Sequence, residues 1–170
     1  DGALVKTKNF GSPKYVGDPI NAVKIFNEKG ADELIVLDID ATRKSLSPNF
    51  KLIQKLAAEC RMPLCYGGGV NSAEFASQLV DIGVEKVAVS SAVITNPKLI
   101  NEMTSAVGRQ SVVVVIDFNK KKNFFSNEYE LCSHNGKKSY EHDPFVFLKK
   151  CQDAGAGEIV INSVSQDGIM

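Results

Sequence analysis

The segment NEKGADELIVLDID (residues 27–40) returns in register near the end of the chain as QDAGAGEIVINSVS (152–165). Both copies place a Gly-Ala pair and then a glutamate, Glu33 or Glu158, in front of a run of apolar residues. A looser third copy is GVEKVAVSS (83–91). This recurrence indicates a chain built from repeated strand–helix units.

Five apolar runs are suited to strands that are buried on both faces, and helical periodicity separates them. The runs are ELIVLD (33–38), PLCY (63–66), KVAVS (86–90), SVVVVID (111–117) and EIVINS (158–163). Helix starts are predicted at pairs that begin with a capping side chain. These are Asp18-Pro19, Ser47-Pro48, Asn71-Ser72, Asn96-Pro97 and Asp143-Pro144. The alternation predicts an α/β fold with parallel strands, which fits an open doubly wound sheet as well as a closed barrel.

The segment 123–140 interrupts this rhythm, and its alternating pattern and Asn-Gly pair predict an inserted hairpin. The whole chain of 170 residues has 44% hydrophobic residues, typical of a single globular domain. Its 20 basic and 20 acidic residues cancel, and its longest apolar run (112–116) is too short to cross a bilayer. We therefore expect neither nucleic acid nor a membrane as a partner.

The four cysteines have no CxxC spacing, and His134 and His142 are the two histidines of the chain. We therefore expect reduced thiols, a cytoplasmic location, and neither a metal nor a cofactor site.

Polar or glycine residues end every predicted strand, and the ends of parallel strands meet at the edge where ligands bind. They are Asp38, the glycines 67–69, Ser90-Ser91, Asp117 and Asn162-Ser163. Asp117 follows four valines and an isoleucine, a setting that suits a general acid or base, although it could also brace the next loop. Asp38 and Asp40 share a face of the predicted strand 33–40. Either could bind a ligand hydroxyl, and Asp40 could instead brace a turn.

Three glycines in PLCYGGGVNS (63–72) precede a predicted helix, where free N–H groups could hold a phosphate. A tight strand-to-helix turn explains them as well. Ser90-Ser91 lies at the end of the next strand, and QDGI (166–169) offers another glycine turn. At the opposite strand ends stand three charges, Glu33, Lys86 and Glu158. They fit solvated strand starts, or a ring at the bottom of a barrel.

The sequence resembles the cyclase subunit family of imidazole glycerol phosphate synthase, in histidine biosynthesis, over essentially its whole length. The stretches that carry the resemblance are DGALVKTKNF, DPINAVKIFNEKGADELIVLDIDAT, PLCYGGGV, GVEKVAVSSAVITNPKLI, VVVVIDFNKK, NGKKS and GAGEIVINSVSQDG. The family is a (β/α)8 TIM barrel of two similar halves. The resemblance thus implies a partial barrel over residues 1–170, covering roughly the second to sixth βα units. Strand one and the last two units are then absent, and we expect this piece alone to be inactive.

The resemblance also implies a reaction, a substrate and a partner. The family is a lyase that closes the imidazole ring of a phosphoribulosyl formimino-carboxamide ribotide, a substrate with two phosphates. It uses ammonia from a glutaminase subunit with which it forms a heterodimer, and it releases aminoimidazole carboxamide ribotide.

The residues matched by the resemblance fall into three groups. Asp117 matches a catalytic aspartate of the family. Glu33, Lys86 and Glu158 match the charged gate through which ammonia enters. The remaining matches bind substrate or its phosphates, and they are Lys6, Asp38, Gly68, Gly69, Ser90, Ser91, Asp167 and Gly168.

Two departures from the family's pattern leave alternatives open. The family usually has Asn-Thr in place of Ser90-Ser91, and an acidic-basic pair in place of Ser165-Gln166. The chain also resembles a paralogous branch that serves amidation of surface-polysaccharide sugars, again with an ammonia-producing partner. The sister isomerase of the histidine pathway is a further alternative, which NGKKS and the three gate residues disfavour.

Overall fold

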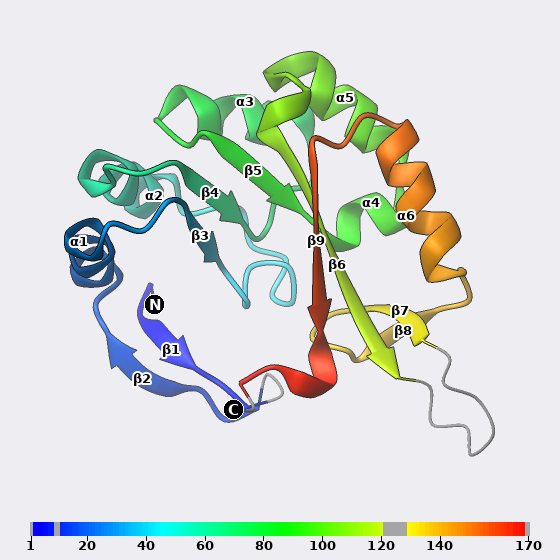
Figure 1. Ribbon diagram of the computed structural model, residues 1–170, viewed down its shortest axis with the longest axis horizontal. Coiled ribbons are helices and arrows are strands. Elements are labelled where there is room, and N and C mark those ends of the chain that lie inside the picture. Colours follow the sequence, from blue (N-terminus) through cyan, green and yellow to red (C-terminus); the bar gives the residue numbers. More distant parts are fainter. Residues whose placement is uncertain (1, 9–10, 121–128, 169–170) are drawn as a thin grey trace.

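A curved parallel sheet with helices on its outer side forms the body of the protein (Figure 1). The computed structural model describes residues 2–8, 11–120 and 129–168. The parallel strands, in their order across the sheet, are β3 (Leu34–Leu37), β4 (Leu64–Gly67), β5 (Lys86–Val89), β6 (Val112–Lys120) and β9 (Glu158–Ser163). All five strands were predicted, and the sheet curls into a half-barrel. The closed-barrel alternative is therefore the one that the structure favours over an open doubly wound sheet.

The helices lie around the outer face of this sheet (Figure 1). They are α1 (Pro19–Lys29), α2 (Phe50–Glu59), α3 (Ala73–Asp81), α4 (Ser91–Thr95), α5 (Lys98–Val107) and α6 (Pro144–Asp153), with short 3-10 turns at η1 (Arg109–Ser111) and η2 (Val164–Gln166). Among the described residues, no helix is long and apolar enough to span a bilayer.

Side-chain caps start three of these helices as the sequence predicts. Asp18 accepts hydrogen bonds from the N–H groups of Ile20 and Asn21, and Asp143 and Ser72 cap α6 and α3 in the same way. These bonds satisfy donors that have no partner in the first helical turn.

Two predicted helix starts were wrong in position. Helix α2 begins at Phe50 rather than after Ser47, because Asn49 accepts from the Leu52 N–H and so caps the helix. Helix α5 begins at Lys98, and the side chain of Asn96 makes no capping bond there. The short helix α4 was not predicted, since five residues are too few to show helical periodicity.

The sheet separates two apolar clusters. The larger one lies between the sheet and the helices and includes Tyr66, Val87 and Ile116. The smaller one consists of Cys65, Ala88, Val113 and Val115, with Val160 packed against it. Members of the two clusters alternate along β4, β5 and β6, as expected for strands that are buried on both faces. The smaller cluster therefore marks the inner face of the half-barrel.

Two hairpins accompany the parallel sheet. Strands β1 (Leu4–Lys6) and β2 (Lys14–Gly17) pair antiparallel as a separate two-stranded sheet, which the sequence did not predict. Strands β7 (Tyr129–Ser133) and β8 (Lys138–Tyr140) pair antiparallel, and β7 also pairs with the end of β6. The hairpin predicted over 123–140 is thus confirmed from Tyr129 onward, and residues 123–128 of that prediction lie outside the described residues.

Candidate active site at the strand ends

Parallel pairing brings the carboxyl ends of β3, β4, β5, β6 and β9 to one edge of the curved sheet. The residues that end these strands therefore face a common rim, as the sequence analysis expected. The β7–β8 hairpin and the turn η2 extend from the same edge (Figure 1).

Asp117 is half-buried in β6, after five buried apolar residues. Its Oδ1 accepts a hydrogen bond of 2.9 Å from Nδ2 of Asn162, the residue beside it in register on β9. Burial raises the pKa of the Asp117 carboxyl, and the nearby charge of Asp167 raises it further, whereas the bond from Asn162 opposes both effects. A carboxyl in this setting exchanges a proton closer to neutrality than an exposed aspartate does.

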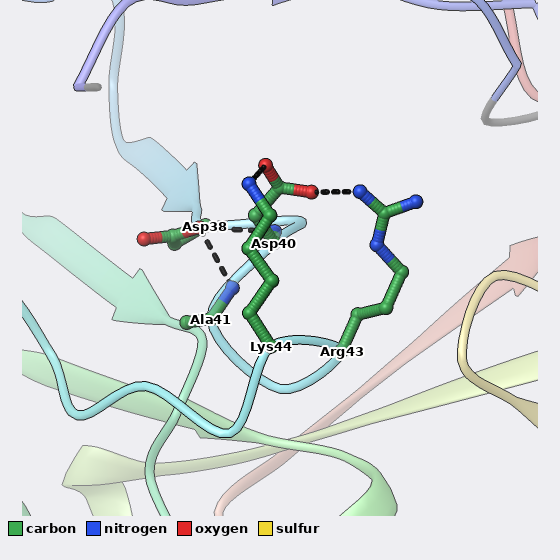
Figure 2. A network of polar contacts seen from close by, with 5 residues as sticks. All are labelled: Asp38, Asp40, Ala41, Arg43 and Lys44. Atoms are coloured by element: carbon green, nitrogen blue, oxygen red, sulfur yellow. Dashed lines mark hydrogen bonds and ion pairs between the residues drawn. The ribbon is translucent and has the colours of Figure 1, made fainter.

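Asp38 and Asp40 do not share a strand, because β3 ends at Leu37 and a turn follows (Figure 2). The prediction that they point to one face of strand 33–40 was therefore wrong. Oδ1 of Asp38 accepts from the N–H groups of Asp40 and Ala41, each at 3.0 Å, and its other oxygen points away from the turn (Figure 2).

Asp40 pairs with two cations of the same turn. Its carboxylate lies 2.7 Å from Nη2 of Arg43 and 2.6 Å from Nζ of Lys44 (Figure 2). The hydrogen bond from Lys44 is the main cause that lowers the pKa of Asp40. Both aspartates therefore brace the turn that follows β3, and the second oxygen of Asp38 makes no hydrogen bond with the residues that the structure describes.

The three glycines after β4 allow close packing of that turn against its neighbours. Gly68 has φ +125°, and a Cβ there would lie 2.6 Å from the main-chain oxygen of Asp38. Gly69 has φ +71°, and its Cβ would lie 2.5 Å from the main-chain oxygen of Leu46. A side chain fits neither the backbone conformation nor the space, so both positions require glycine.

Gly69 also lines a small cavity of about 180 Å³ between the loop after β3, the loop after β4 and the start of α4. Ser91 lines the same cavity, together with Thr42, Ser45, Ser47 and Asn71. The Gly69 N–H lies 3.4 Å from Oγ1 of Thr42. The structure thus brings two predicted phosphate residues together, whereas the other two, Gly68 and Ser90, are not among the residues that line this cavity.

The remaining rim residues lie by the N-terminal hairpin. Oδ2 of Asp167 accepts a hydrogen bond of 3.3 Å from the Thr7 hydroxyl, and Gly168 packs so closely on Thr7 that a Cβ would meet its main-chain oxygen. Lys6 belongs to β1, opposite Lys14, and is exposed. This hairpin is separate from the parallel sheet, so Lys6 lies outside the strands of the half-barrel.

Glu33, Lys86 and Glu158 come together at the opposite edge of the sheet, where β3, β5 and β9 begin. Nζ of Lys86 lies 2.9 Å from Oε2 of Glu33 and 2.6 Å from Oε1 of Glu158. The hydrogen bonds to Glu158 and Glu33 raise the pKa of Lys86, so it stays a cation. These charges therefore form one ion-paired cluster rather than three separate solvated strand starts.

Sequence reasoning missed several residues of the rim. Asn162 was noted only as a strand end, although it contacts Asp117. Asn71 was noted only as part of a helix start, and Thr42 and the hairpin residues Ser133 and Tyr140 were not singled out. The signal in the sequence for a functional role of the hairpin was its position after a strand end, because insertions at such places often carry functional residues.

Comparison with known proteins agrees with this arrangement. The histidine biosynthesis protein family matches residues 1–170, and the fold of that family is a TIM barrel. The chain is 53% identical to the "Putative imidazole glycerol phosphate synthase subunit HisF" of Leptospira interrogans, over 99% of this chain and 66% of the relative. It is 52% identical to a relative of Vibrio vulnificus named as subunit hisF3, over 98% and 64% of the two chains. It is also 46% identical to one of Pseudomonas aeruginosa named as subunit hisF2, over 99% and 66%.

The chain spans slightly less than two thirds of the length of these relatives. The family match itself extends from the first to the last residue of the sequence. The chain therefore belongs to the histidine biosynthesis protein family.

Proposed function

We propose that this chain is part of a cyclase that uses ammonia to close the imidazole ring of imidazole glycerol phosphate. The substrate is the phosphoribulosyl formimino-carboxamide ribotide, and aminoimidazole carboxamide ribotide is released. The observation that carries the proposal is Asp117, a half-buried carboxyl of raised pKa, held by Asn162 at the rim where barrel enzymes do their chemistry. The names of the relatives support the same reaction.

Asp117 is the general acid or base of this reaction. Ring closure requires protons to move at the attacking ammonia and at the leaving amine, and a carboxyl of raised pKa can both take and return them. The bond from Asn162 fixes one carboxylate oxygen, and among the described residues the other makes no hydrogen bond, so that oxygen is the one assigned to the substrate.

The two phosphates of the substrate bind at opposite parts of the rim. One occupies the cavity lined by Gly69 and Ser91, whose lining also includes the hydroxyl side chains of Thr42, Ser45 and Ser47. The other lies by Asp167 and Gly168, whose turn meets the N-terminal hairpin. Lys6, Asp38, Gly68 and Ser90 remain proposed substrate contacts in the ligand-bound enzyme.

Ammonia enters from the opposite edge of the sheet through the cluster of Lys86 with Glu33 and Glu158. The partner is a glutaminase subunit that covers this edge in a heterodimer and produces ammonia there. Because Lys86 is ion-paired to both glutamates, ammonia passes only when these contacts rearrange.

The test is Asp117→Asn in the complete protein, assayed with ammonium salt in place of glutamine so that the partner is not needed. The expected result is loss of ring closure with an unchanged circular dichroism spectrum. The exposed Asp81→Asn serves as the matched control and should retain full turnover. Normal turnover of Asp117→Asn would refute the role of Asp117.

We propose as a second candidate that the chain serves amidation of a surface-polysaccharide sugar, passing ammonia from its glutaminase to a sugar amidotransferase. The motive for this candidate is Ser90-Ser91, where the family usually has Asn-Thr. The names hisF3 and hisF2 number those relatives as copies and name no sugar. The test is growth without histidine in a strain that lacks its own cyclase. Rescue by the complete protein supports the first candidate, and failure of a well-expressed protein supports the second.

A further inference from the structure

A second cavity continues the one at Gly69. It has a volume of about 310 Å³, and it shares Thr42, Asn71, Ser91 and Ala92 with the first cavity. Its far wall is the β7–β8 hairpin, which contributes His134, Lys138 and Tyr140. The two cavities therefore form one groove that runs from the glycine turn to the hairpin.

The charges of this groove are unevenly placed. The first cavity is lined by hydroxyl, amide and apolar groups, and none of the described residues around it is charged. Lys138 brings an ammonium group to the second cavity, His134 adds an imidazole, and the described lining of both cavities includes no carboxylate. An anion bound at the first cavity alone would lose water without gaining a counter-charge, which is unfavourable.

Contacts within the β7–β8 hairpin position the side chains of His134 and Lys138. Ser133 is 1% exposed, and its Oγ lies 2.8 Å from Nδ1 of His134 and 3.0 Å from the hydroxyl of Tyr140. This network fixes the imidazole ring, because Ser133 can donate one bond and accept another. Nζ of Lys138 lies 5.1 Å from the ring centroid of Tyr140, a cation–π contact.

The turn of the β7–β8 hairpin also packs against the turn η2. Gly136 has φ +77°, and a Cβ there would lie 2.8 Å from Cγ1 of Val164, in the turn η2 that follows β9. Ser133 and Lys138 are opposite each other in the hairpin register, so the buried network and the ammonium group belong to neighbouring positions. The main chain that carries Lys138 is therefore held by the contact of Gly136 with Val164 and by pairing with Ser133.

We propose that Lys138 and His134 are binding residues for a phosphate monoester seated over Ser91, where the two cavities join. Lys138 supplies the counter-charge that the glycine turn lacks, His134 donates a hydrogen bond, and Ser133 and Tyr140 position them. The inference rests on the proposed function for the presence of a phosphate here, and it adds the hairpin as the cationic side of the site.

The test is calorimetric titration of the complete protein with ribose 5-phosphate at low ionic strength. Lys138→Met should weaken binding by about 10-fold or more, the usual effect of losing a hydrogen bond between a charged donor and its acceptor. Lys137→Met is the matched control, because Lys137 is exposed in the turn and is not among the residues lining either cavity. Its affinity should stay within about twofold of the unmodified protein, since exposed charges are well screened.

Two variants of Tyr140 test whether its ring, rather than its hydroxyl, positions the ammonium group of Lys138. Tyr140→Phe keeps the ring under Lys138 and should retain most of the affinity, whereas Tyr140→Leu removes the ring and should lose it. Equal affinities of Lys138→Met and Lys137→Met would overturn the inference and leave the proposed function standing. If ribose 5-phosphate does not bind even the unmodified protein, the inference fails, and turnover of the ribotide substrate then decides the proposed function separately.

Discussion

Tyr66 carries a buried hydroxyl that should destabilise the protein. The residue lies in β4 within the main core and is 4% exposed, and its hydroxyl has no hydrogen-bond partner among the described residues. Burial and the charge of Asp38 both raise the pKa of Tyr66, so the hydroxyl stays neutral. A buried polar group without a partner costs about 1–3 kcal/mol.

Tyr66→Phe removes that hydroxyl and keeps the ring in the core. We expect the free energy of unfolding to rise by about 1 kcal/mol, which corresponds to an increase in Tm of about 2–4 °C for a protein of this size. Urea denaturation followed by circular dichroism measures the change at 25 °C, and a thermal melt checks it.

Tyr140→Phe is the internal comparison, because it removes a hydroxyl that does have a partner, Ser133 at 3.0 Å. It should lower the free energy of unfolding by about 0.5–1.5 kcal/mol. The opposite signs of the two changes are the prediction. If Tyr66→Phe also destabilises the protein by more than about 0.5 kcal/mol, its hydroxyl makes a bond and the reasoning is refuted.

Two further substitutions probe the rim. Gly69→Ala should cost about 1–2 kcal/mol for the left-handed backbone alone, and more because its Cβ meets the Leu46 main-chain oxygen. Gly30 is also left-handed, but a Cβ there has nothing within 4 Å, so Gly30→Ala should lose only the free energy due to the backbone conformation. Urea denaturation measures both variants. Equal losses would show that the contact of the Gly69 Cβ with Leu46 has no cost. Because the folded pKa of Asp117 is raised, the native state loses stability as pH rises from about the ordinary value of 3.8 through the folded pKa. Asp117→Asn should therefore be more stable than the unmodified protein at pH 7, with a gain that fades towards pH 4, and a less stable variant at pH 7 would contradict this.

The parts of the fold that could be predicted are those set by nearby residues. Each parallel strand is an apolar run, and Asp18 and Asp143 act on N–H groups two or three residues away. The predicted start of α2 was wrong because Ser47 and Asn49 are both residue types that cap helices well. Only the structure shows that Asn49 makes the capping bond. The N-terminal hairpin was missed because its short strands lack a clear alternating pattern.

The candidate site was predictable only in part, for a similar reason. Asp117 follows from its place after a buried strand, and the charges at Glu33, Lys86 and Glu158 could be noted one by one. Lys86 pairs with both Glu33 and Glu158. This arrangement depends on the curvature of the sheet, which the sequence pattern does not give. The bond from Asn162 to Asp117 depends on strand register, which apolar runs alone do not determine.

The ion pairs of Lys86 also have a consequence for how the protein folds. Its partners lie 53 and 72 positions away in the chain. Glu33 directly precedes β3 and Glu158 begins β9, and neither strand is a sheet neighbour of β5. Contacts between such distant residues are expected to form after local ones, because the entropy of loop closure opposes them until the intervening segments are ordered. We therefore expect the cluster to form late in folding, after the local strand–helix units have assembled. A probe at Lys86 would then report when the sheet acquires its curvature, separately from when its helices form.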